Sequence, residues 1–287
     1  MFIASERVVC PPRAGCPFHT TAKRYWMPEF TANQDDPDAL TLILLHSTSF
    51  HKETWEPTLH QIFQRARRPG SDPTLLVLRE AWALDCPNHG EAVQYNEDVL
   101  HEEEHAKEGF TCQKYAHAIH SFLSAGVNEG ARVNFEKRRL VGIGHSLGAN
   151  AILLAQQYEP RLPFSSIVII EPMVSPKGVT HMKDLGRSLI ENALRRRDVW
   201  GSREDAVTHF TKATDWDTRV IRLFAVSLQY GLFTREFAKF LNPVKEYGLR
   251  ATTHHPGSGQ HGVALACTRE QEAVSPKVNY VFFKAEV

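Results

Sequence analysis

One stretch of this chain has the residue types and spacing that activate a serine as a nucleophile: Gly144-His145-Ser146-Leu147-Gly148. An apolar run at 140–143 precedes it and helix-forming residues follow it, so Ser146 falls at a turn between a strand and a helix. The turn is sharp, and the two glycines keep side chains away from the serine. We expect the Ser146 hydroxyl to be exposed and the Leu147 amide, at the helix N-terminus, to face a developing oxyanion. The alternative is a serine that caps an ordinary helix.

A second stretch, His101-Glu102-Glu103-Glu104-His105, matches the His-Glu-x-x-His pattern of zinc peptidases. This spacing would place both imidazoles on one face of a helix. The consecutive glutamates leave no apolar face to bury such a helix, and no third ligand follows at a suitable spacing. We interpret the stretch as a charged surface segment, and we expect neither a metal site nor a cofactor.

The hydrophobic pattern predicts the elements that must position Ser146. Short apolar runs predict strands at residues 6–10, 22–26, 40–45, 74–78, 140–143, 166–170 and 278–283. Amphipathic segments predict helices at residues 55–67, 110–123, 149–158, 189–197, 204–212 and 219–230. Strands alternate with helices in the first part of the chain, which is typical of a mostly parallel sheet flanked by helices. Apolar residues of the later helical region, such as Phe224 and Leu228, either cover a substrate pocket or fill that region's own core.

Composition excludes several classes of function. The 287 residues carry a formal net charge of zero, which favours neither nucleic acid nor an anionic membrane as a partner. No apolar run approaches the roughly 18 residues of a membrane-spanning helix, and the N-terminal residues do not resemble a secretory signal. The five cysteines are scattered along the chain, which predicts reduced thiols in an intracellular protein.

Four segments together resemble one group of fungal α/β-hydrolases. They are the Phe-His-Lys-Glu-Thr-Trp-Glu-Pro stretch at 50–57, the serine motif at 144–150, Arg-Arg-Asp-Val-Trp at 196–200, and Ala-Leu-Ala-Cys-Thr at 264–268 with Glu272 after it. The group is the toxin-biosynthesis and peroxisomal hydrolases, which includes host-selective toxin hydrolases and the acyl-CoA hydrolase of mycophenolic acid formation. The resemblance covers nearly the whole chain. The serine motif is shared widely, and its combination with the lid segment at 196–200 is more specific.

The resemblance implies an α/β-hydrolase core at residues 1–180, a helical lid at 181–250 inserted after the sixth strand, and a loop with the last core strand at 251–287. It also implies cofactor-independent hydrolysis of an ester or an acyl thioester by Ser146. In this group the acid can follow the sixth strand, where Glu171 lies. Many hydrolases have His-Gly after the third strand, at the second oxyanion-hole donor; here Ser47 replaces the glycine, and Thr48 is the expected donor, with Ser49 second. The segment from Asp85 to Gly90 resembles a supporting loop, so His89 is expected to be structural.

The sequence leaves several alternatives for the general base. The group's catalytic histidine follows an eighth strand, and the last strand expected here is about the seventh. Either the chain is shortened, or another histidine is recruited, or the protein binds a ligand without turnover. The histidines after Glu171 are His181, His209, His254, His255 and His261. If the acid follows the seventh strand instead, Glu286 is the candidate.

Expectations about partners and location rest on the same resemblance. The partner is a small-molecule acyl substrate, and the oligomeric state is left open. The group implies a peroxisomal location, although Ala285-Glu286-Val287 is not a Ser-Lys-Leu-type address, and a cytoplasmic location is the alternative.

Overall fold

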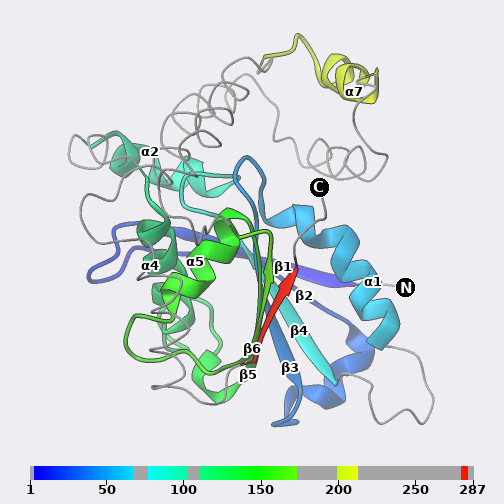
Figure 1. Cartoon of the computed structure of the whole chain (residues 1–287), viewed down its shortest axis with the longest axis vertical. Helices are drawn as coiled ribbons and strands as arrows, with labels where there is room; N and C mark the ends of the chain where they lie inside the picture. Colours follow the sequence, from blue (N-terminus) through cyan, green and yellow to red (C-terminus); the bar gives the residue numbers. More distant parts are fainter. Residues whose placement is uncertain (1–2, 67–76, 103–109, 173–198, 213–278, 284–287) are drawn as a thin grey trace.

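The computed structural model describes residues 3–66, 77–102, 110–172, 199–212 and 279–283 (Figure 1). Its strands are β1 (Ala4–Cys10), β2 (Thr20–Trp26), β3 (Leu40–Leu45), β4 (Leu78–Leu84), β5 (Arg139–His145), β6 (Phe164–Ile170) and β7 (Asn279–Phe283). Its α-helices are α1 (Glu56–Ala66), α2 (Ala92–His101), α4 (Cys112–Leu123), α5 (Leu147–Ala155) and α7 (Arg203–Lys212). Three 3₁₀ turns complete the described elements: η1 (Pro28–Gln34), η2 (Lys52–Trp55) and η3 (Phe135–Lys137).

The strands form one sheet of seven in the order β1-β2-β4-β3-β5-β6-β7. β2 runs antiparallel to both of its neighbours, β1 and β4, and every other adjacent pair is parallel. Consecutive parallel strands need crossover connections, which helices supply. The α/β-hydrolase architecture expected from the sequence is therefore confirmed, with a mostly parallel sheet and helices on both of its faces.

The two faces of the sheet bury separate hydrophobic clusters. Alternate residues of β3 face opposite sides: Ile43 and Leu45 pack with α4 and α5, whereas Leu42 and Leu44 pack with α1. Figure 1 shows the same arrangement, with α4 and α5 on one side of the sheet and α1 on the other. A strand buried on both faces has a continuous apolar run, which is why β3 was predicted with its observed bounds.

The prediction for the fourth strand is wrong. A strand was expected at residues 74–78, of which 74–76 lie outside the described residues, but β4 continues past this range, from Leu78 through Arg79 and Glu80 to Leu84. Both charged residues are buried, because Glu80 pairs with arginines of neighbouring segments and Arg79 donates to backbone carbonyls. The search for apolar runs failed here because a charged side chain can lie inside a sheet when it has ion-pair or hydrogen-bond partners, as these two residues do.

Most of the predicted lid lies outside the described residues. Of its expected helices only the one at 204–212 is described, as α7. The predicted boundaries at 180/181 and 250/251 also fall outside the described residues and stay predictions. None of the described helices has the length and apolar character needed to cross a bilayer.

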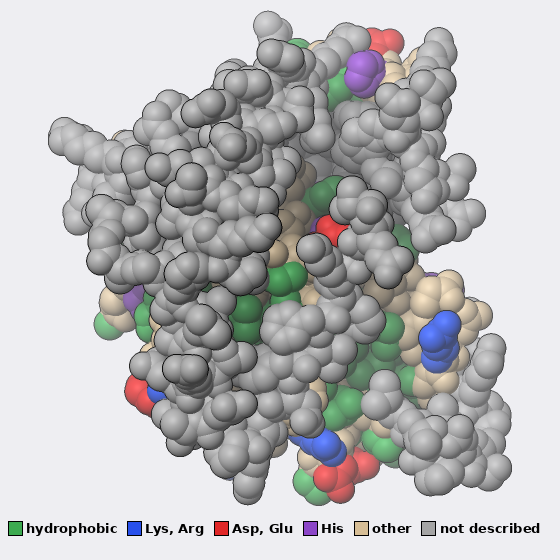
Figure 2. Space-filling view, viewed as in Figure 1, with side chains coloured by type: hydrophobic (Ala, Val, Ile, Leu, Met, Phe, Trp, Pro, Cys, Tyr) green, Lys and Arg blue, Asp and Glu red, His purple; other side chains and the backbone are tan. Residues whose placement is uncertain are grey.

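Figure 2 shows one face of the molecule. Described hydrophobic side chains gather towards the middle of this face, and Lys and Arg side chains appear as separate points near its edge.

Candidate active site

Ser146 lies at the turn between β5 and α5, and its backbone is strained. Its φ is 51° and its ψ is −109°, a conformation that residues with a side chain rarely adopt. The Ser146 amide donates to the Ile170 carbonyl at 2.9 Å, which ties the turn to the end of β6. The Ser146 carbonyl accepts from the Asn150 amide at 3.1 Å, so the helix begins directly after the serine. The predicted strand, sharp turn and helix are all present around Ser146.

The two glycines of the motif allow close approaches that a side chain would prevent. A Cβ at Gly144 would lie 2.6 Å from the Cα atom of Ala149, within the start of α5. A Cβ at Gly148 would lie 2.4 Å from the Leu45 carbonyl oxygen, at the end of β3. Helix α5 therefore starts in contact with β3, and the turn that follows β3 lies beside the serine.

That turn contains Thr48, the expected second oxyanion-hole donor, and Ser49, the alternative to it. Ser49 has a φ of 68°, and its amide donates to Nε2 of His89 at 3.0 Å. Among the described residues, the Thr48 amide has no hydrogen-bond acceptor. The Leu147 amide, at the first position of α5, belongs to the set of N-terminal amides that a helix leaves without internal partners.

Two buried histidines hold this turn in place. His46 Nδ1 bonds to the Ser47 carbonyl at 2.8 Å and its Nε2 accepts from the Cys86 amide at 3.0 Å. His89 accepts from Ser49 through Nε2, and its Nδ1 bonds to Asn88 Oδ1 at 2.7 Å. Burial lowers the pKa of His46 to about 4, partly opposed by the Asp85 carboxylate, and burial also holds the pKa of His89 well below its usual range. Both rings are neutral at pH 7 and have both nitrogens engaged, so neither is available as a general base.

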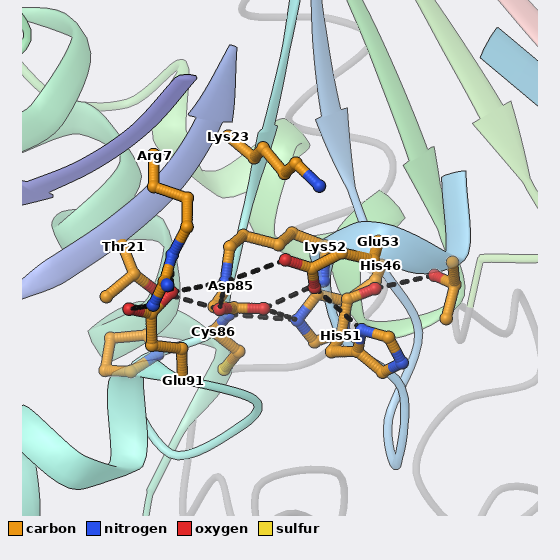
Figure 3. Close-up of polar contacts among 12 residues, drawn as sticks. Arg7, Thr21, Lys23, His46, His51, Lys52, Glu53, Asp85, Cys86 and Glu91 are labelled. Atoms are coloured by element: carbon orange, nitrogen blue, oxygen red, sulfur yellow. Dashed lines mark hydrogen bonds and ion pairs between the residues drawn. The ribbon is translucent and has the colours of Figure 1, made fainter. Parts of the chain in front are cut away.

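A buried ionic cluster joins the same two loops (Figure 3). Lys52 Nζ lies 2.6 Å from Asp85 Oδ2, 3.0 Å from Glu91 Oε2 and 3.3 Å from Glu53 Oε1. Burial lowers the pKa of Lys52, but the carboxylates around it outweigh burial and raise that pKa above its ordinary value. The sequence placed Asp85 in an expected supporting loop and Lys52 and Glu53 in a segment of the family resemblance, but it did not predict that these charges meet.

Glu171, the expected acid, directly follows β6 and has a φ of 47°. Its side chain is exposed, and Ile170 before it accepts the hydrogen bond from the Ser146 amide. Burial lowers the pKa of His145, the neighbour of Ser146, and the Glu171 carboxylate partly offsets that shift. The structure thus brings Glu171 to the same edge of the sheet as Ser146.

Most candidate bases lie outside the described residues, namely His181, His254, His255 and His261, and so does Glu286. His209 is described: it is exposed on α7, with its ring 5.7 Å from that of Trp200, and α7 lies apart from the sheet in Figure 1. His101 ends α2, whereas His105 is outside the described residues. Within the described ranges, no three His, Cys, Asp or Glu side chains are grouped as metal ligands.

The geometry around Ser146 agrees with a comparison against protein families. The model of the alpha/beta hydrolase family matches residues 42–275, which is most of the chain. The chain belongs to this family. Its membership accounts for the strand order, the turn at Ser146 and the position of the loop after β3.

Curated relatives of this α/β-hydrolase are fungal. A type I acyl-CoA thioesterase, mpaH, from Penicillium brevicompactum is 29% identical over 183 residues, which cover 62% of this chain and 37% of that protein. A protein of the same description from Penicillium roqueforti is 27% identical over 202 residues, covering 67% of this chain and 41% of that protein. The chain therefore spans about two fifths of the length of these relatives.

Solved structures show the same fold. The peroxisomal alpha-beta-hydrolase Lpx1 from Saccharomyces cerevisiae superimposes with a TM-score of 0.59 at 16% identity, covering 98% of this chain and 74% of that one. An alpha/beta hydrolase from Novosphingobium aromaticivorans superimposes with a TM-score of 0.54 at 13% identity, covering 97% of this chain and 90% of that one. At these identities the likeness supports the fold alone.

Proposed function

We propose that this α/β-hydrolase is a serine hydrolase of esters or acyl thioesters, with Ser146 as the nucleophile. The observation that carries the proposal is the strained backbone of Ser146 at a strand-to-helix turn, next to the loop after β3. A non-glycine residue with positive φ has a steric cost, and such strain is concentrated at functional sites.

The proposed reaction has two steps. Ser146 Oγ attacks the carbonyl carbon while a histidine base takes its proton, and the amides of Leu147 and Thr48 stabilise the oxyanion. Collapse of the tetrahedral intermediate expels the alcohol or thiol, and water then releases the acid from the acyl-enzyme. Thr48 is favoured over Ser49 as the second donor because the Ser49 amide already donates to His89.

Glu171 is proposed as the carboxylate that orients the base. It lies at the end of the strand next to Ser146, and its exposed side chain can reach a histidine supplied by another segment. The base itself is proposed to come from the histidines at 254, 255 or 261, or from a segment of a longer protein.

The proposed substrate class is an acyl-CoA-like thioester or a related ester of fungal secondary metabolism, including toxin biosynthesis. Support comes from the resemblance to the fungal hydrolase group and from the two Penicillium acyl-CoA thioesterases. A peroxisomal location is proposed on the resemblance alone. A fluorescent-protein fusion that stays in the cytoplasm would contradict it.

Labelling with a fluorophosphonate probe tests the nucleophile. We expect the wild-type chain to be labelled and Ser146→Ala to lose labelling and p-nitrophenyl butyrate hydrolysis, with little change in Tm, because the hydroxyl contributes no described hydrogen bond. Ser165→Ala is the matched control: this hydroxyl is also half-buried in the sheet, where it donates to the Leu140 carbonyl at 3.0 Å. Labelling that persists in Ser146→Ala contradicts the assignment. A wild-type chain that folds, binds an acyl thioester and is never labelled lacks its base. If a longer protein that extends past Val287 is not labelled either, the alternative of a binding protein is supported.

A further inference from the structure

Two loops next to Ser146, one after β3 and one after β4, are joined to each other by several hydrogen bonds and ion pairs. We call residues 46–53 the oxyanion loop and residues 85–91 the support loop. The Lys52 amide donates to Asp85 Oδ1 at 2.8 Å, and Lys52 Nζ donates to Asp85 Oδ2 at 2.6 Å. One carboxylate of the support loop therefore binds both the backbone and the side chain of the same residue of the oxyanion loop.

The pair is deeply buried and well supported. The Lys52 side chain is 1% exposed and that of Asp85 is fully buried. Thr21 Oγ1 donates to Asp85 Oδ2 at 2.8 Å. The Glu91 carboxylate accepts hydrogen bonds from both Lys52 and Arg7. Figure 3 shows Thr21 of β2 and Lys52 of the oxyanion loop beside Asp85, and Arg7 of β1 beside Glu91.

Net stability is a poor explanation for such a pair. The cost of removing two charges from water offsets most of their attraction, and apolar residues of similar volume often stabilise a core as well. A directed ion pair adds geometric constraint, because charge-assisted hydrogen bonds fix both distance and angle. What it constrains here is the path of the oxyanion loop.

That path includes Thr48. On one side of Thr48, the Ser47 carbonyl accepts from the Phe50 amide at 3.2 Å and from His46 Nδ1. On the other side, the Ser49 amide is held by His89, a residue of the support loop. The residues before and after Thr48 are thus fixed, and the Thr48 amide has no acceptor among the described residues.

We propose that Lys52 and His89 are positioning residues that, through Asp85 and the Ser49 amide, hold the Thr48 amide at the oxyanion position. Neither side chain touches the substrate. The proposal rests on the serine-hydrolase function proposed above. It extends that function by naming residues that decide how well the transition state is stabilised.

The test compares Lys52→Met with Lys23→Met in the full chain. Lys23 is a matched control because it is also a buried lysine in an ion pair, but its partner is Glu56 of α1, whose Oε1 lies 2.8 Å from Lys23 Nζ. We expect Lys52→Met to lower kcat for p-nitrophenyl butyrate by about 10- to 100-fold with KM changed less than about 3-fold, because a small displacement of a transition-state donor costs this much. The affinity for butylboronic acid, whose serine adduct places an oxygen in the oxyanion hole, falls in parallel, and Lys52→Arg restores part of both.

A second pair of variants does not depend on the folding of Lys52→Met. His89→Gln keeps a side-chain acceptor for the Ser49 amide and His89→Leu removes it, so kcat and boronate affinity are expected to be at least about 10-fold lower in the leucine variant. Equal kcat in the two His89 variants, or in folded Lys52→Met and Lys23→Met, overturns the positioning proposal while wild-type hydrolysis upholds the serine-hydrolase function. Absence of Ser146-dependent hydrolysis and labelling, both in this chain and in a longer protein that extends past Val287, overturns both.

Discussion

At the scale of single residues, strain and burial distinguish the site from the rest of the sheet. Ser146 and Glu171 directly follow adjacent parallel strands, β5 and β6, and both have positive φ. Each such residue costs roughly 1–3 kcal/mol, which the surrounding structure must supply. Two of them at neighbouring strand ends indicate that both side chains are held in set directions before any substrate binds.

Glu171→Gln tests the proposed acid. We expect kcat to fall by about 10² to 10⁴, because a neutral amide neither stabilises the imidazolium nor enforces its tautomer. The Tm should change little, since the Glu171 side chain is exposed. Steady-state kinetics with p-nitrophenyl butyrate provides the measurement. If Glu286→Gln lowers kcat this far and Glu171→Gln does not, the acid follows the seventh strand instead.

The buried ring of His46 predicts a pH dependence of folding stability. Burial lowers the pKa of His46 to about 4, below its ordinary value of 6.5, so between these values the unfolded chain binds a proton that the folded chain does not. Stability is therefore lost as the pH falls below 6.5, by about 2 kcal/mol from this residue at pH 5.

Urea unfolding of His46→Asn at pH 7 and at pH 5 measures this contribution. The variant is less stable at both values, but its stability should fall less than that of the wild type between them. His60→Asn, which changes an exposed histidine of α1, should keep the wild-type difference. An unchanged pH dependence in His46→Asn would contradict the assignment of this proton to His46.

At the scale of elements, the sequence predicted those features that depend on the local pattern of residues along the chain. Strand β3 and the turn at Ser146 follow from apolar runs and glycine spacing, and the observed bounds of β3 agree with the prediction. β5 (Arg139–His145) is longer than the predicted 140–143, and α5 (Leu147–Ala155) begins and ends before the predicted 149–158. β4 was misplaced because buried Arg79 and Glu80 depend on partners far away in the sequence. The Lys52–Asp85 pair was missed for the same reason: a pattern along the chain does not show which charges meet across loops.

Gly148→Ala tests the contact between α5 and β3. An added Cβ would lie 2.4 Å from the Leu45 carbonyl oxygen, so the helix start must shift away from the strand. We expect a loss of about 1–3 kcal/mol in the free energy of unfolding and weaker fluorophosphonate labelling of Ser146. Gly126→Ala is the control, since a Cβ there meets no atom within 4 Å. Wild-type labelling in folded Gly148→Ala would show that the contact does not position the serine.

At the scale of the whole molecule, the sheet is held together across its width by charges as well as by its two apolar clusters. Glu80 of β4 is fully buried and binds Arg24 of β2 at 2.5 Å, Arg138 before β5, and Trp82 Nε1 at 3.0 Å. This cluster lies at residues near the start of β4, whereas Asp85 and the support loop follow its end. The two ionic clusters thus have different roles. The Glu80 cluster joins strands, and the Lys52–Asp85 cluster joins the loops beside Ser146.

Glu80→Gln separates these two effects. Removing the carboxylate charge leaves Arg24 and Arg138 partly buried without their anion, and breaking a buried pair in this way costs about 3–5 kcal/mol. Glu6→Gln is the matched control, because Glu6 contacts the same Arg24 at 4.0 Å from an exposed position, where a pair contributes about 0–1 kcal/mol. Urea unfolding measures both losses. In the folded fraction of Glu80→Gln we expect the wild-type rate of fluorophosphonate labelling, because the loops beside Ser146 keep the Lys52–Asp85 pair. A labelling rate that falls with stability would show that the sheet, rather than the Lys52–Asp85 pair, positions the oxyanion hole.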